Sequence, residues 1–85
     1  MIKKKFFQIF NERFKIEKEL RVNLLARKKD IKINTFQDWD SMKHVVILMA
    51  IEKKFKIKIT DKNAFYFTSF KSGLDYVEKF IEGNH

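Results

Sequence analysis

Residues 36–55 read FQDWDSMKHVVILMAIEKKF, and this stretch decides the fold. Every residue from Val45 to Ile51 is apolar, whereas polar or charged residues stand on both sides of the run. The stretch contains neither proline nor glycine, so nothing in it interrupts a helix. We therefore predict a helix from about Ser41 to Phe55.

The predicted helix carries apolar side chains on more than one face. At 100° per residue, they form two groups: Ile47, Leu48, Ile51 and Phe55, and on another side Met42, Val45 and Met49. A helix in a small bundle needs only one apolar stripe for the core. The second stripe suits a docking surface, where flexible methionine adapts to varied partners. In the alternative, both stripes are core, and residues 27–38 cover the second.

A serine stands at the start of this helix. Asp38, Asp40 and Ser41 are all residue types that cap helices, and a serine cap contributes about 1 kcal/mol to stability. A serine where a loop meets a helix is also exposed, and the amide groups and dipole of a helix N-terminus favour an anion there. Two interpretations follow: Ser41 is a cap, or it is a hydroxyl that another enzyme modifies.

The composition predicts an all-α protein. The chain has 85 residues, which suits a single domain over residues 1–85. Hydrophobic residues make up 45%, ten of them phenylalanine, so a packed core is expected rather than disorder. There is no proline and there are only two glycines, which argues against a turn-rich β-sandwich. The absence of cysteine excludes disulfides, zinc thiolates and a cysteine nucleophile.

The residues before the central stretch predict one long helix and a loop. Apolar residues recur at helical spacing from Ile2 to Phe14, which indicates an amphipathic helix of three or four turns. Leu20 and Leu24 keep a similar period, so the helix can continue past Ile16. Residues 27–38 are expected to form a loop that is anchored by a few apolar side chains.

The residues after the central stretch predict a connector and two helices. Residues 55–60 alternate like a strand, but no second run is available to pair with them, so we expect a packed connector. Asp61 can cap a short helical turn, and Thr68 or Ser69 can cap a last helix that Gly83 ends. The predicted fold is a small four-helix bundle with three longer helices and one short helix. Its predicted core is Phe6, Phe10, Phe14, Leu48, Ile51, Phe55, Leu74, Val77 and Phe80.

The chain is strongly basic, but the charge is uneven. The net charge is +8. Residues 1–32 hold 11 of the lysines and arginines against 4 acids, whereas residues 33–85 hold 8 against 7. The sequence shows no convincing signal peptide and no apolar run of about 20 residues that could span a membrane. We therefore expect a cytoplasmic protein.

The central stretch resembles the acyl carrier protein family, in its stand-alone form. Asp40-Ser41-Met42 and the helix ending in Ala50-Ile51-Glu52-Lys53-Lys54-Phe55-Lys56-Ile57 are similar to the family's Asp-Ser-Leu signature and Leu-Glu-Glu-Glu-Phe-Gly-Ile helix end. The segment from Phe70 to Ile81 is similar to the family's last helix. The resemblance covers residues 36–82, and the first helix matches only in kind. It implies the four-helix bundle of that family.

The resemblance also implies a function. Ser41 would receive 4′-phosphopantetheine from coenzyme A through a phosphopantetheinyl transferase, with Asp40 near the metal of that reaction. The arm's thiol would carry acyl or aminoacyl groups as thioesters between loading and transferring enzymes of a fatty-acid-like or specialised biosynthetic pathway. The chain itself would be no enzyme, would hold no metal, and would be a monomer by default. The residues expected to contact partners are Met42, Lys43, Val45, Met49 and Lys53.

Two features depart from the family or qualify the resemblance. Carrier proteins of the family are acidic along this helix, but the matching positions here include Lys43, Val46 and Lys53, and only Glu52 is an acid. Partners with acidic or mixed docking sites are therefore expected. Beside the serine, Trp39 is expected to anchor the loop on the core and His44 to be packed or hydrogen-bonded to the loop.

Other functions compete with this one. A small basic helical nucleic-acid-binding protein would use Lys3–Lys5 and Arg27–Lys29 for phosphates and phenylalanines for stacking. Against it, the phenylalanines stand at core spacing, so nucleic acid is the less favoured partner. An interaction module without a cofactor is a further alternative with no motif of its own. Asp38 and Asp40 are an apparent acid pair, but no nucleophile and base accompany them, which argues against an enzyme.

Overall fold

The computed structural model describes residues 2–36 and 39–83. It contains four α-helices and one 3-10 helix in the order α1 (Ile2–Asn11), α2 (Lys18–Leu25), α3 (Ser41–Phe55), η1 (Ala64–Thr68) and α4 (Phe70–Gly83). No β-strand occurs in these residues, apart from a single antiparallel bridge between Lys32 and Ser69. The fold is all-helical and compact, with a radius of gyration of 12.1 Å. Within the same residues, no helix combines the length and apolar character needed to cross a membrane.

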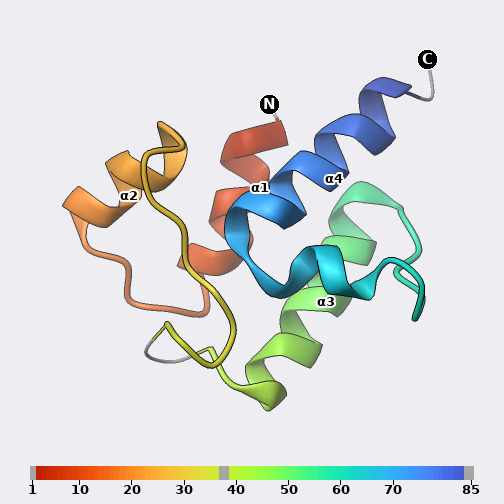
Figure 1. Ribbon diagram of the computed structural model, residues 1–85, viewed down its shortest axis with the longest axis horizontal. Coiled ribbons are helices and arrows are strands. Elements are labelled where there is room, and N and C mark those ends of the chain that lie inside the picture. The colour runs from red at the N-terminus through yellow and green to blue at the C-terminus, as the bar shows by residue number, and fades with distance from the viewer. Residues whose placement is uncertain (1, 37–38, 84–85) are drawn as a thin grey trace.

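Helix α1 lies at the centre of the molecule. It packs against α2, α3 and α4, and α2 lies at one end of the view, away from α3 (Figure 1). Aromatic rings form much of the contact between α1 and α4. The ring centroids of Phe6 and Phe10 each lie 5.2 Å from that of Phe70 in α4. Four residues of α1 are buried: Phe6, Phe7, Ile9 and Phe10.

The prediction of one helix running past Ile16 is wrong, because the chain breaks after Asn11 and α2 begins only at Lys18. Folding back instead brings Phe14 and Leu24 into the core. The guanidinium of Arg13 donates to Ile9 O at 2.8 Å and so satisfies a carbonyl of the last turn of α1.

The observed order of helices differs from the predicted order. The described residues form four α-helices, of which α2 was not predicted, and the expected short helix is the 3-10 helix η1. The prediction of a packed connector is confirmed, since residues 57–60 form no strand and Ile57 is buried. The cap predicted at Ser69 is confirmed as well, because its Oγ accepts from Ser72 N at 3.1 Å.

Six of the nine predicted core residues are buried, with at most 5% of their surface exposed. Leu48 and Phe55 pack only partly against the core. Phe80 is wrong as a core residue, with 39% of its surface exposed. It stands at the edge of the apolar stripe of α4, where its ring stacks on Tyr76 with centroids 6.5 Å apart.

The long loop is fixed to the start of α4. Ile33 N donates to Thr68 O at 2.9 Å and Phe70 N donates to Ile31 O at 3.0 Å. Asp30 adds a bond from Lys71 N to its Oδ1 at 2.8 Å. These bonds hold residues 30–33 against α4 and η1, so this part of the loop cannot lie over the outer face of α3.

Candidate functional site

Asp40 caps helix α3. Its backbone is extended, and its side chain Oδ1 accepts from Lys43 N at 2.9 Å. Its carbonyl accepts the first helical bond, from His44 N at 2.9 Å. Asp40 is thus the N-cap that satisfies an otherwise unpaired amide. Of the other two candidates, Asp38 lies outside the described residues, and Ser41 is already the first helical residue.

Ser41 is exposed at the first position of α3. The interpretation of Ser41 as a simple cap is wrong, because Asp40 occupies that position. In the described part of the chain, the Ser41 hydroxyl makes no hydrogen bond, and the backbone amides of Ser41 and Met42 have no acceptor. An anionic group attached at Ser41 would therefore meet two available amides and the positive end of the helix dipole.

Trp39 and His44 fix the approach to this helix. Trp39 is 1% exposed, with its ring edge-on to Phe10 at a centroid distance of 5.1 Å. Its indole N–H donates to His44 Nδ1 at 3.1 Å. Burial lowers the pKa of His44, which favours the neutral ring that can accept this bond. The predicted roles of both residues are confirmed, and together they set where the chain emerges at Asp40 and Ser41.

The second apolar stripe of α3 lies in solvent. Met42 is 80% exposed, Met49 62% and Val45 56%. Ile47 and Ile51, on the opposite face, are fully buried. The alternative in which both stripes are core is therefore wrong. Sequence analysis missed Val46, 47% exposed, although its position four residues after Met42 places it on the same face.

Three charged residues of α3 make different contacts. Lys43 Nζ donates to Arg13 O at 3.1 Å and lies 5.5 Å from the centre of the Phe14 ring, so it reaches the end of α1. Lys53 lines a groove between α1 and α3. Glu52, the one acid of α3, accepts from Ile59 N at 2.8 Å and so holds the connector.

The α1–α3 groove has a volume of about 640 Å³. Ile9 of α1 and Arg13, in the turn after α1, line it on one side, and Val46, Met49, Lys53 and Lys54 line it from α3. It adjoins the exposed stripe and shares Val46 and Met49 with it. The structure thus places Met42, Lys43, Val45, Met49 and Lys53, predicted as partner contacts, on or beside one surface that begins next to Ser41.

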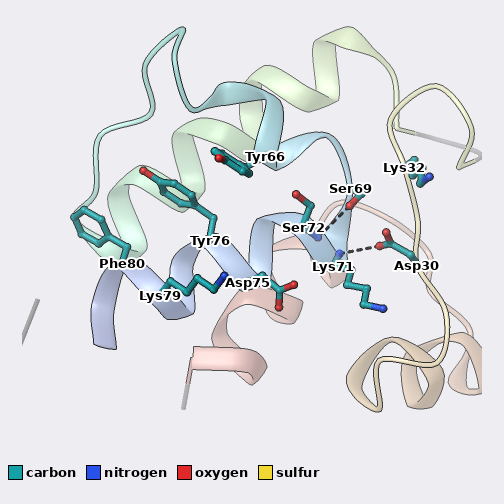
Figure 2. Close-up of a pocket in the computed structure, with 10 residues that line it drawn as sticks. All are labelled: Asp30, Lys32, Tyr66, Ser69, Lys71, Ser72, Asp75, Tyr76, Lys79 and Phe80. Carbon is teal, nitrogen blue, oxygen red and sulfur yellow. Dashed lines mark hydrogen bonds between the residues drawn. The ribbon is translucent and has the colours of Figure 1, made fainter. Parts of the chain in front are cut away.

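A second groove, of about 760 Å³, lies between the long loop, η1 and α4. Figure 2 shows Tyr76 and Phe80 towards one end and Asp30 and Lys32 towards the other. Its carboxylates serve the fold, because Asp30 holds the start of α4 and Asp75 forms an ion pair with Arg27. Within the described residues, no three His, Asp or Glu side chains gather where they could hold a metal ion.

No protein-family model matches this chain, and no solved structure matches it.

Proposed function

We propose that this chain is a carrier protein that holds acyl or aminoacyl groups as thioesters on a 4′-phosphopantetheine arm at Ser41. One observation carries the proposal: an exposed serine stands at the first position of α3, while the preceding Asp40 performs the capping. Among the described residues, the hydroxyl makes no hydrogen bond that the fold uses. A family resemblance over residues 36–82 points to the same serine.

The chemistry fits the position. In the modification, the serine oxygen attacks the pyrophosphate phosphorus nearer the pantetheine of coenzyme A. The bond to adenosine 3′,5′-bisphosphate breaks, the serine proton is lost, and a phosphodiester remains on the protein. Its negative charge would lie at the N-terminus of α3, where the amides of Ser41 and Met42 have no acceptor among the described residues. The thiol arrives with the arm, so a chain without cysteine can still carry thioesters.

The partner enzymes would dock beside the arm. Met42, Val45 and Met49 would provide the apolar contact, and Lys43 and Lys53 the charges at its edge. All five are exposed, and all belong to the helix that begins at Ser41. A partner on this surface would have the arm's attachment point at its edge.

The structure gives less support to nucleic-acid binding by the first segment. Phe6, Phe7 and Phe10 of α1 are at most 5% exposed, so they are not available to stack on bases. The exposed lysines of this segment, among them Lys4, Lys5, Lys28 and Lys29, would offer phosphate contacts but no stacking.

The test is the intact mass of the chain after incubation with coenzyme A and a broad-specificity phosphopantetheinyl transferase. We expect a gain of one phosphopantetheine in the wild type and none in Ser41→Ala. Ser72→Ala is the matched control and should still be modified, because Ser72 lies on α4 and lines the groove beside Tyr76 and Phe80. A folded wild-type chain that gains no mass, or a Ser41→Ala chain that still gains it, would contradict the proposal.

A further inference from the structure

The α1–α3 groove has an apolar floor that is partly exposed. Val46 is 47% exposed and Met49 is 62% exposed, and Ile9 closes the floor from α1. On a helical wheel, Met42, Val45, Val46 and Met49 all fall within about 100°. Four large apolar side chains on one exposed helix face are more than the scattered apolar residues of an ordinary surface.

The rim of this groove is basic. Lys53 and Lys54 line it from α3, Arg13 lines it from the turn after α1, and Lys43 reaches the Arg13 carbonyl beside it. Neither Lys53 nor Lys54 forms an ion pair within the described residues. The one acid in the lining, Glu12, is paired with Arg13 at 3.4 Å.

Shape and charge together point to one kind of occupant. We propose that the α1–α3 groove binds an amphipathic helix of a partner protein, with apolar residues facing the groove and carboxylates on both flanks. A hollow between two helices receives the ridge of a third helix, whereas a bilayer surface would need a flat or convex apolar face. As an identification of the carrier's partners, this inference rests on the function proposed above.

The direct probes are two synthetic helical peptides with the same leucines at i, i+3, i+4 and i+7. One has glutamate and the other lysine at the flanking positions. Binding is measured by fluorescence anisotropy on the Ser41→Ala chain, which has no attachment serine at position 41. We expect the acidic peptide to bind at least about tenfold more tightly at low salt, and the difference to shrink in about 1 M salt.

Charge reversal makes the test specific to the groove. Lys53→Glu with Lys54→Glu should reverse the preference, so that the basic peptide binds more tightly than the acidic one. Lys28→Glu with Lys29→Glu is the matched control, since this adjacent exposed pair follows α2 and does not line the groove. It should leave the preference intact. Circular dichroism should show that both variants are folded.

Three results would overturn the proposal: equal binding of the two peptides, an equal effect of the two charge reversals, or binding of phosphatidylglycerol vesicles with no binding of either peptide. The arm is tested separately by mass. Modification at Ser41 without peptide preference would leave a carrier with differently charged partners. Peptide preference without modification would leave a protein-binding module with no arm.

Discussion

At the scale of single residues, the hydrogen bond between Trp39 and His44 holds the start of α3 in place. The buried indole N–H needs an acceptor, because an unsatisfied buried donor costs about 1–3 kcal/mol. His44 Nδ1 provides it at 3.1 Å, but only when that nitrogen carries no proton. The geometry beside Ser41 therefore depends on the protonation state of one histidine.

This dependence predicts a loss of stability in mild acid. Burial lowers the pKa of His44 in the folded chain below the ordinary 6.5, so the unfolded chain takes up the proton first as pH falls. The stabilising contribution is complete above about pH 6.5 and is lost as pH falls from there through the folded-state pKa. Urea unfolding from about pH 7.5 to 5.5 should show this decline. In His44→Gln, which keeps an acceptor but does not titrate, the decline should be smaller; an equal decline would contradict this explanation.

Gly73 is a second position where one residue decides the packing. A Cβ there would lie 2.9 Å from Phe6 Cζ and 3.2 Å from Phe67 Cδ1, and both rings are buried. Gly73→Ala should therefore destabilise the fold by about 1–3 kcal/mol, less the small gain in helix propensity. Gly83→Ala is the control, because nothing lies within 4 Å of its Cβ position. Thermal unfolding should rank Gly73→Ala clearly below Gly83→Ala, and equal midpoints would show that the rings can move aside.

At the scale of elements, α3 combines a cap, a core face and an exposed face. The cap comes from Asp40, the core face includes Ile47 and Ile51, and the exposed face includes Met42 and Met49. One helix thus packs on the core by one side and exposes the other to solvent. Ser41 stands where the exposed face begins, so attachment and docking would share one rigid element.

The division of labour between Asp40 and Ser41 predicts different effects of their loss. Asp40→Ala removes the cap and should cost about 1 kcal/mol. Ser41→Ala removes an exposed hydroxyl that has no hydrogen bond in the described chain, so its effect should stay within about 0.5 kcal/mol. Denaturant unfolding of the two variants measures the difference. If Ser41→Ala were the more damaging substitution, the hydroxyl would have a structural role after all.

At the scale of the whole molecule, α2 is held more loosely than the other helices. Only Leu24 of α2 is fully buried. Polar contacts provide further links: Lys3 Nζ donates to Leu25 O at 2.7 Å, and Arg27, just after the helix, forms ion pairs with Asp75 and Glu78 of α4. Partial burial lowers the pKa of Arg27, but these two carboxylates outweigh it and leave that pKa raised.

This arrangement predicts that α2 opens independently. Its amides should exchange with deuterium faster than the central amides of α3, because few buried apolar contacts hold it. Arg27→Gln should speed exchange in α2 further. The free energy of opening α2 should fall by less than about 1 kcal/mol, because the ion pairs are partly exposed. Exchange in α3 should not change. Equal exchange rates in α2 and α3 of the wild type would instead show a single cooperative unit.

The sequence by itself determined the local features. The unbroken apolar run from Val45 to Ile51 predicted α3, and its two stripes predicted which face is buried, because helical periodicity is a local property. The aromatic residue beside the motif was correctly expected to anchor the loop. The exposure of the second stripe was favoured from the sequence, but the loop that might have covered it left the question open.

Only the tertiary structure decided the rest. No proline or glycine marks the break between α1 and α2 in the sequence, and the break brings Phe14 and Leu24 into the core. Which of three neighbouring residues caps α3 depended on backbone geometry at Asp40. The basic α1–α3 groove joins residues more than 30 positions apart, such as Ile9 and Met49. Such contacts are fixed by packing between elements, and helical periodicity within one element does not reveal them.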